Sequence, residues 1–524
     1  MAFYKKYIFK VSLIFILLLT GFLCAYTIKN YTGTTSVNQN RFEGTRPSES
    51  SGIASNDGES GRQSEMHKPN GIIQHQNGQT DKRNAGLNIG SGIKYNAQII
   101  IYSIAFLALF IAAYYILVHR KSIKIDPHNL GILMLTLVGT GLFLRIIMAL
   151  IIEGYSSDLN LFKTWAAAAS NNLLGVYSSS KSIDYPPLYM YVLSLIGKVA
   201  NIQALNSYYM LLLKLPSIAA DIVSSLFIYK LSRKHFSQEV SMFLMAFYIF
   251  NPAVFVNSAI WGQVDSFFTL FVISSVYMLE EGRICFASIL YSAGVMMKPQ
   301  GIIFLPVLFF ELVRLKKVRN FLNAAACGLA SAFIIILPFS INKGFTWIFK
   351  LYSGTVGEYP YASVNAFNFF SLIGKNYAKD TITFLGLSYH NWGMIFIVLI
   401  TLYSWVLYMK ADSKTFIPIV SLIEIAGVFT FSASMHERYL FPAAALAILA
   451  FIYLKDKRLP LLAAGFSSTI FINTYYVLYE NMKGANSIPY NNILIFTSLL
   501  NVILFIYLLK VSFDIAVKKK TFLI

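Results

Sequence analysis

Residues 130–152 read LGILMLTLVGTGLFLRIIMALII, an apolar run that carries a single charge, Arg145. A helix of this length crosses the roughly 30 Å of hydrocarbon in a bilayer. Apolar stretches of roughly 17–25 residues recur along the whole chain, whereas an outer-membrane barrel would show shorter, alternating segments. The sequence therefore predicts an all-α fold, a polytopic transmembrane helical bundle.

The composition of the 524 residues agrees with this fold class. Hydrophobic residues make up 56% and charged residues 13%, and the mean hydropathy of +0.58 excludes a string of soluble domains. The net charge of +19 comes mostly from short Lys and Arg clusters between apolar runs, where they orient spans and meet anionic lipid. Nucleic-acid binding is therefore excluded. The three cysteines, Cys24, Cys285 and Cys327, lie in apolar segments without CxxC spacing, which disfavours disulfide frameworks and structural zinc.

The basic clusters predict fourteen spans with both termini in the cytoplasm, because Lys and Arg gather on the cytoplasmic side of membrane helices. The cluster Lys5, Lys6 and Lys10 places the N-terminus inside, and the turn at Arg120 and Lys121 is also cytoplasmic. The predicted spans are residues 8–27, 97–118, 130–152, 207–230, 239–260, 264–280, 284–297, 301–315, 321–340, 392–409, 415–434, 439–454, 460–479 and 492–512.

Four regions follow from this pattern. Residues 1–27 resemble a signal anchor, with a cleaved signal peptide as the alternative. Residues 28–96 are rich in Ser, Gly, Asn, Gln and Thr, so they predict a disordered external linker. Residues 97–129 add one span and a cytoplasmic turn, and residues 130–515 form the core. Within the first external loop of the core, residues 153–206, helices near 159–174 and 187–200 are expected to lie at the membrane surface.

The polar residues outside the basic clusters converge on the predicted external face. This favours a site at the outer membrane surface over a transporter, whose ionisable groups would lie near the midplane in two related halves. The deeper Lys214, Asp221 and Glu424 are costly in isolation. We interpret them as interhelical polar contacts.

Five motifs on that face resemble those of the GT-C glycosyltransferases. They are SSDLNLFKTW (156–165), DYPPL (184–188), WGQVDS (261–266), KPQ (298–300) and MHERY (435–439). The chain is similar to bacterial relatives of the GPI-anchor mannosyltransferases, and it shares DYPPL with the dolichyl-phosphate-glucose-dependent glucosyltransferases. The resemblance covers roughly residues 130–515. It implies a lipid-phosphate-linked monosaccharide donor, an inverting transfer at the external face, and a catalytic Asp in the first external loop of the core.

Asp158 is the candidate catalytic residue. An inverting transfer needs one base to take the proton of the acceptor hydroxyl, and Asp158 lies six residues beyond a predicted span, within reach of a lipid-borne donor. The alternative is a helix N-cap, because Ser156, Ser157 and Asp158 precede an amphipathic run. The resemblance favours the base.

Substrate contacts are expected from two further motifs. Asp184 and Tyr185 precede two prolines, so they either position the acceptor or shape a rigid turn. Trp261 and Gln263 suit stacking and hydrogen bonding to a sugar, although Trp is also common at membrane interfaces. Asp265 begins the next helix, as a cap or as a partner of a sugar hydroxyl.

The leaving lipid phosphate gains negative charge during transfer, so fixed cations beside it are expected. Arg438 is the main candidate, since its guanidinium can hold two phosphate oxygens. His436 and Lys298 are further phosphate candidates, and Glu437 is a substrate-binding candidate. The alternatives are a solvated charged turn at 436–438 and a Lys298 that snorkels to the interface. No HExxH, DxD or EF-hand pattern is present, so no cofactor or metal is expected, although a divalent cation shared by Asp158 and the donor phosphate stays open.

The sequence thus predicts a membrane-embedded hexosyltransferase, mannosyltransferase-like, of the bacterial plasma membrane. Its partners would be a polyprenyl-phosphate-linked sugar and an unidentified glycan, lipid or protein acceptor of the cell envelope. A lipid-linked-sugar flippase or transporter is the alternative, and a non-catalytic scaffold explains the linker but not the external polar residues. The loop 342–391 carries second-tier candidates at 358–361 and 363–368, which suit sugar contact and an interfacial loop equally.

Overall fold

A computed structural model describes residues 2–33, 93–117, 124–179, 183–341, 343–344 and 346–523. The chain divides into a large unit, Met1–Tyr31 with Gly90–Ile524, and a second unit, Thr32–Ile89. The second unit, and with it most of the predicted linker 28–96, lies outside the described residues. So does the predicted turn at Arg120 and Lys121. Everything below concerns the large unit.

The described residues are mostly helical and contain almost no strand, which confirms the all-α class. They contain ten helical segments that are long and apolar enough to cross a membrane. The main helices of these ten segments are α1 (Ala2–Lys29), α2 (Asn96–Tyr115), α3 (Leu130–Ile151), α7 (Tyr209–Ser232), α8 (Gln238–Ile249), α13 (Val318–Ser340), α16 (Tyr389–Ala411), α17 (Ile417–Phe431), α19 (Leu459–Met482) and α20 (Asn492–Ala516). Two of them reach membrane length only with their neighbours: α8 continues through α9 (Pro252–Phe255) and η4 (Val256–Trp261), and η6 (Lys414–Phe416) precedes α17. The chain is therefore an integral, multi-pass membrane protein.

Shorter elements complete the unit. They are α4 (Ser156–Asn171), α5 (Val176–Ser179), α6 (Pro187–Ala200), α9 (Pro252–Phe255), α10 (Asp265–Glu280), α11 (Ile284–Met297), α12 (Leu305–Leu315), α14 (Trp347–Gly357), α15 (Phe369–Leu372), α18 (Pro442–Leu454) and the turns η2 (Pro127–Asn129), η3 (Asn206–Tyr208), η4 (Val256–Trp261), η5 (Pro299–Phe304) and η6 (Lys414–Phe416). The strands β1 (Thr383–Phe384) and β2 (Leu387–Ser388) form an antiparallel hairpin in which Thr383 pairs with Ser388.

Four of the fourteen predicted spans coincide with short helices: α10, α11, α12 and α18. The longest, α10, has 16 residues and measures roughly 24 Å, less than the hydrocarbon thickness. The helices are present, but the count of fourteen crossings is not confirmed. All thirteen residues of α18 are buried, and five alanines among them allow close helix packing. This short helix is part of the centre of the bundle.

The three deep polar residues contact neighbouring helices, as the sequence predicted. Asp221 on α7 accepts a hydrogen bond from Arg145 Nε on α3 at 2.8 Å. Lys214 Nζ donates to the carbonyl oxygens of Ala149 at 3.2 Å and Ile152 at 2.7 Å, where α3 ends. Glu424 on α17 accepts from Thr401 on α16 at 3.2 Å. Each costly polar group is thus matched across a helix interface.

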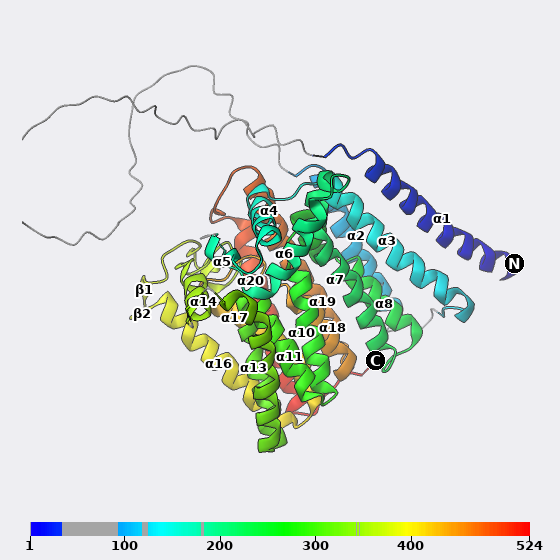
Figure 1. Ribbon diagram of the computed structural model, residues 1–524. Coiled ribbons are helices and arrows are strands. Elements are labelled where there is room, and N and C mark those ends of the chain that lie inside the picture. Colours follow the sequence, from blue (N-terminus) through cyan, green and yellow to red (C-terminus); the bar gives the residue numbers. More distant parts are fainter. Residues whose placement is uncertain are drawn as a thin grey trace, which may run out of the picture. The chain divides into compact units, whose positions relative to one another are not determined.

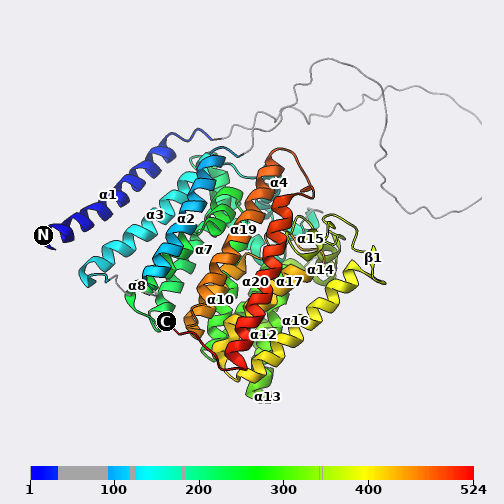
Figure 2. The ribbon, with the colours of Figure 1, turned by 180° about the vertical axis from the view of Figure 1, so that it is seen from behind.

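The short elements of the first external loop and of the loop 342–391 gather at one end of the long helices. Figures 1 and 2 show α4, α14 and the β1–β2 hairpin at this end, close to where α3 ends and α16 begins. α14 contacts the first loop directly, because Thr355 Oγ1 donates to the carbonyl oxygen of Asp184 at 2.9 Å. The predicted site residues lie at this same end.

Candidate active site

Two glycines let the start of α4 pack against the end of η4. Gly154 has a φ of +89°, and a Cβ there would lie 2.7 Å from the carbonyl oxygens of Ile260 and Trp261. Gly262 has a φ of +85°, and a Cβ there would lie 2.8 Å from Leu159. Side chains would be both strained and obstructed at these positions. η4 is itself a π-helical turn, a feature that is frequent at functional sites.

This close packing fixes the carboxylate of Asp158. Its Oδ2 accepts hydrogen bonds from Trp261 Nε1 at 2.8 Å and from Gln263 Nε2 at 2.6 Å. The N-cap alternative is wrong, because the cap position of α4 is Tyr155 and Asp158 is the third residue of the helix. The side chain of Asp158 is 29% exposed. Asp158 is therefore a held but accessible carboxylate.

Asp265, the first residue of α10, is a buried junction of charges. It pairs through Oδ1 with Lys298 Nζ, and its Oδ2 accepts from Asn257 Nδ2 of η4 at 3.0 Å and lies 3.9 Å from Arg438 Nε. Lys298 is only 2% exposed, so it does not snorkel to the interface. Its cation is held inside the protein, against Asp265.

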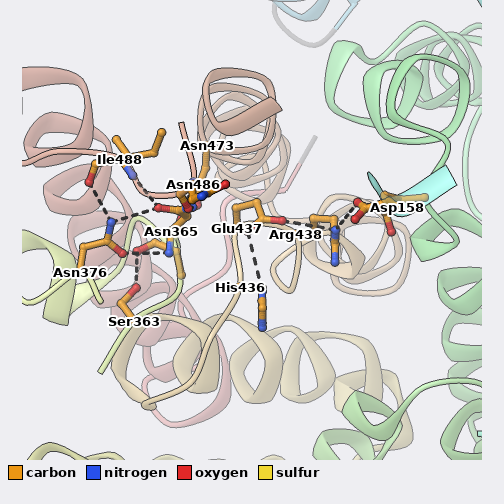
Figure 3. Close-up of polar contacts among 12 residues, drawn as sticks. Asp158, Ser363, Asn365, Asn376, His436, Glu437, Arg438, Asn473, Asn486 and Ile488 are labelled. Carbon is orange, nitrogen blue, oxygen red and sulfur yellow. Dashed lines mark hydrogen bonds and ion pairs between the residues drawn. The ribbon is translucent and has the colours of Figure 1, made fainter. Parts of the chain in front are cut away.

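Arg438 is the centre of the constellation. Figure 3 shows its guanidinium between Asp158 and Glu437: Nη1 lies 3.6 Å from Asp158 Oδ2 and 3.4 Å from Glu437 Oε1. The guanidinium carbon lies 5.3 Å from the ring centroid of Trp261, a cation–π distance. Arg438 Nε is buried and has no hydrogen-bond partner among the described residues. One donor of the guanidinium is thus unused by the protein.

The turn at 436–438 is buried rather than solvated, although its internal ion pair is present. His436, Glu437 and Arg438 are 13%, 6% and 16% exposed. Burial and the nearby cations of Arg438 and Lys298 lower the pKa of His436 to about 3, so its imidazole is neutral at pH 7. Burial raises the pKa of Glu437 above its ordinary value, with Arg438 opposing the rise. The turn supplies one fixed cation and one neutral ring.

Asp184 and Tyr185 lie at the edge of this cluster. Lys298 Nζ is 5.8 Å from the ring centroid of Tyr185, and that ring packs 5.5 Å from Trp165 of α4. The Oδ1 atom of Asp184 is buried with no hydrogen-bond partner among the described residues. Burial, reinforced by the Glu358 carboxylate, raises the pKa of Asp184 to about 6.

Residues 362–371, which we call the inserted segment, pack more deeply into the bundle than the external loop that the sequence predicted. They enter the bundle, because Asn473 Nδ2 donates to the carbonyl oxygen of Asn365, and Asn501 Nδ2 to that of Phe367, each at 2.8 Å. Asn473 and Asn501 lie roughly 13 Å along their helices from the ends nearest the site. Such non-helical backbone is tolerated at this depth only where protein encloses it. With nine of the ten residues at most 3% exposed, direct sugar contact by Ser363–Asn368 is not supported.

The inserted segment instead supports the turn that carries Arg438. Val364 N donates to the carbonyl oxygen of Met435 at 2.9 Å, and Val364 and Asn365 form strand-like bridges with His436. Asn365 has a φ of +55°, and Asn376 Nδ2 and the Ile488 backbone N–H both donate to its Oδ1. Figure 3 shows the contacts of Asn365 with Asn376 and Ile488. The asparagines between Ser363 and Asn368 were the only sequence signal of this role.

The structure thus brings every predicted site residue to one end of the bundle. Among the residues that the structure describes, no group of three or more His, Cys, Asp or Glu is arranged to hold a metal ion. The residues that the sequence missed are Asn257, Gly154 and Gly262, and Asn365 was a candidate for sugar contact rather than for support of the turn. Their roles depend on contacts between segments far apart in the chain.

The helical membrane bundle and a family match together support a glycosyltransferase of the GT-C class that uses a lipid-linked sugar. The matching family is that of the dolichyl-phosphate-mannose-protein mannosyltransferases, and its model covers residues 184–341. That range contains Asp184, Trp261, Asp265 and Lys298, whereas Asp158 and the turn at 436–438 lie outside it. No curated protein matches the chain.

Proposed function

We propose that this protein transfers a hexose, mannose or a similar sugar, from a polyprenyl-phosphate donor to a hydroxyl group of a cell-envelope acceptor. The observation that carries the proposal is the exposure of Asp158. Three carboxylates surround Arg438, and Asp158 is 29% exposed whereas Asp265 and Glu437 are 4% and 6% exposed. Asp158 is the one carboxylate of the three that a substrate reaches without rearrangement.

The proposed step is an inverting displacement. The Asp158 carboxylate takes the proton of the acceptor hydroxyl while the acceptor oxygen bonds to the anomeric carbon. On the opposite face, the bond from that carbon to the phosphate oxygen breaks, and its electron pair leaves with the phosphate. The products are the inverted glycoside, a polyprenyl phosphate and protonated Asp158. A general base of this kind contributes about 10²–10⁴ in rate.

Arg438 is the proposed contact of the leaving phosphate. Its unused Nε donor and its planar fork suit a phosphate oxygen, and the fixed cation stabilises the charge that develops there. Lys298 is already paired with Asp265. We therefore propose that it contributes positive charge near the phosphate, and that Arg438 makes the first contact. His436 offers a neutral hydrogen bond. In this scheme Glu437 orients the Arg438 guanidinium.

The remaining predicted residues divide between positioning and substrate contact. Trp261 and Gln263 are each 1% exposed and donate to Asp158, so they orient the base; contact with the sugar stays a prediction. Asp184 and Tyr185 are proposed to face the acceptor, because Asp184 retains an unpaired buried oxygen. The proposal needs no metal, and a cation brought in with the donor phosphate would have to bind Asp158.

We place the site end of the bundle outside the plasma membrane and both termini in the cytoplasm, from the positions of the basic clusters. Cysteines introduced at the exposed Ser156 and Ser487 should react with a membrane-impermeant thiol reagent in intact cells, whereas one at the exposed Ser237, near Ser232 in the predicted cytoplasmic turn, should not. The parent protein with its three native cysteines replaced by Ser is the control. Labelling at Ser237 in sealed cells would reverse the orientation.

The decisive experiment offers the purified protein a panel of polyprenyl-phosphate sugars together with a soluble acceptor. We expect consumption of one hexose donor and a product with the opposite anomeric configuration, read by NMR. The matched control is the Asp158→Asn protein. If no donor is consumed but the protein moves a fluorescent lipid-linked sugar across sealed vesicles, the flippase alternative is correct instead.

A further inference from the structure

A second recess lies away from the candidate active site, between α2, α3 and the residues that follow α8. Its volume is about 330 Å³. At about 30 Å³ for each water-sized group, it has room for on the order of ten such groups. Its walls are mainly apolar, with Ile99 from α2, Leu144 and Met148 from α3, and Phe255 from α9. An apolar recess of this volume between membrane helices suits a hydrocarbon chain.

One lining residue is a charged donor with spare capacity. Arg145 is 1% exposed, and its Nε pairs with Asp221 while its Nη1 donates to the carbonyl oxygen of Gly141 at 3.1 Å. Its Nη2 has no hydrogen-bond partner among the described residues. A buried N–H that is left unpaired is destabilising. The recess therefore needs an occupant that is apolar along its length and carries an oxygen acceptor.

The depth of Arg145 limits what that acceptor is. Arg145 lies six positions before Ile151, where α3 ends, so it is roughly 9 Å along the helix from that end. The ester carbonyls of a glycerophospholipid lie inward of its phosphate. A polyprenyl phosphate, in contrast, is pure hydrocarbon inward of its phosphate. At this depth an ester carbonyl oxygen can accept a hydrogen bond from Arg145 Nη2, whereas an isoprene unit has no acceptor.

Charge at the mouth of the recess favours an anionic headgroup. Tyr95, a lining residue, has the Lys94 ammonium 5.2 Å from its ring centroid. Asp221 already balances the charge of Arg145, so Lys94 contributes a further positive charge on this side. Basic residues near the membrane surface attract anionic lipid.

We propose that this recess binds one acyl chain of an anionic glycerophospholipid, with an ester oxygen accepting from Arg145 Nη2 and the headgroup phosphate beside Lys94. The site is separate from Asp158 and does not rest on the proposed sugar transfer. It has a structural link to the active end, because Ser258 of η4 donates to the same Asp221 oxygen that Arg145 contacts. Arg145 and Asp221 thus connect the bound lipid to η4, the turn that contains Trp261.

The test compares lipid retention by two variants of α3. Met148→Trp fills the recess, and Leu135→Trp adds the same bulk at a position that is 56% exposed and outside the recess. The full-length proteins are equilibrated in detergent with ester-linked phosphatidylglycerol, ether-linked phosphatidylglycerol, phosphatidylcholine or polyprenyl phosphate, and retained lipid is counted by native mass spectrometry. Thermal unfolding confirms that each variant is folded, and Leu144→Phe replaces Met148→Trp if that protein misfolds.

We expect the wild type and Leu135→Trp to retain the ester-linked phosphatidylglycerol about three- to tenfold better than its ether analogue, the worth of one hydrogen bond. Lys94→Gln should reduce the preference for phosphatidylglycerol over phosphatidylcholine. Met148→Trp should lose both retention and discrimination. Equal retention of ester and ether lipids, stronger retention of polyprenyl phosphate, or equal behaviour of the two Trp variants would overturn the proposal.

Discussion

Two groups of buried charges in this protein differ in how completely they are matched. Inside the bundle, Arg145 and Asp221 form a pair with side chains 1% and 0% exposed, and Ser258 adds a hydrogen bond to the carboxylate. One cation meets one anion. Such a pair lowers the cost of burying each charge, and removing either partner leaves the other uncompensated.

At the candidate active site the numbers of positive and negative groups are not equal. Arg438 and Lys298 face three carboxylates, from Asp158, Asp265 and Glu437. The most exposed of these is also the one held by two neutral donors rather than by a close ion pair. The protein thus maintains an accessible carboxylate beside a guanidinium with an unused donor. A purely structural ion pair gains nothing from that arrangement, whereas proton transfer beside a leaving phosphate requires it.

Matched substitutions of the two aspartates should give opposite results, and this is the largest effect expected. Asp158→Asn should lower the transfer rate by about 10²–10⁴ because an amide cannot accept the proton, while thermal stability stays near that of the wild type. Asp221→Asn should cost about 3–5 kcal/mol of stability, since it leaves Arg145 unpaired, with near-normal turnover by the folded fraction. Initial rates and thermal unfolding are measured for both. Near-normal turnover by a folded Asp158→Asn protein would remove the base assignment.

Two substitutions of Arg438 separate the contribution of its positive charge from that of its planar guanidinium. Arg438→Ala should lower the rate by about 10²–10³ because the developing phosphate charge loses its fixed partner. Arg438→Lys keeps a cation but loses the planar fork, so its rate and donor affinity should lie between Ala and wild type. Initial rates across donor concentrations give both quantities. Unchanged donor dependence in Arg438→Ala would move the phosphate role to Lys298.

The inserted segment is expected to act through Arg438, with a smaller effect. Asn365→Ala removes the side chain that fixes the segment against Asn376 and Ile488. The guanidinium of Arg438 should then shift slightly, and the transfer rate should fall about tenfold, less than the roughly 10² expected when a catalytic group is displaced by 1 Å. The donor KM should rise and the acceptor KM should stay constant. Asn391→Ala, an exposed position at the start of α16, is the control. A fall in stability without any change in donor KM would mean that the segment is only structural.

Asp184 should give the smallest effect, seen in pH dependence. Its pKa is raised in the folded state to about 6 from an ordinary value of 3.8, so the folded protein holds this proton more tightly. The resulting stabilisation is present below about pH 4 and is lost as the pH rises through 6. Asp184→Asn should therefore raise the melting temperature at pH 7.5 and leave it nearly unchanged at pH 4. An equal shift at both pH values would show that the carboxyl does not titrate in this range.

Much of the fold and of the candidate site was accessible from the sequence. Apolar length and sparse charge predicted the helices, because hydrocarbon leaves the backbone no partner outside its own helix. The order of the motifs relative to the basic clusters predicted that Asp158, Trp261, Asp265, Lys298 and Arg438 share one end of the bundle. That inference needs only the alternation of spans, which is a one-dimensional property.

The pairings within the site could not be predicted in the same way. Asp158 was open to an N-cap role because its local sequence suits both a cap and a base. The start of α4 at Ser156 removed the cap, and the approach of Trp261 and Gln263 gave the carboxylate its partners. The loop at 363–368 read equally as sugar contact or interface, and the insertion of that segment between α19 and α20 overturned the contact. The span count stays unconfirmed at α10, α11, α12 and α18, since length alone does not say whether a short apolar helix crosses or stops inside the bundle.

The sequence by itself determined that this chain is a helical membrane protein with its chemistry at one end, because transfer of apolar residues from water and the placement of basic residues act on each segment separately. Tertiary structure decided that Asp158 is the accessible carboxylate and that Lys298 is closely paired with Asp265. It also decided that Arg438 and Arg145 each keep one N–H donor without a partner among the described residues. These properties depend on distances between α3, α7, η4 and the turn at 436–438. Such distances are set by packing among residues up to about 300 positions apart, and no local pattern in the chain encodes them.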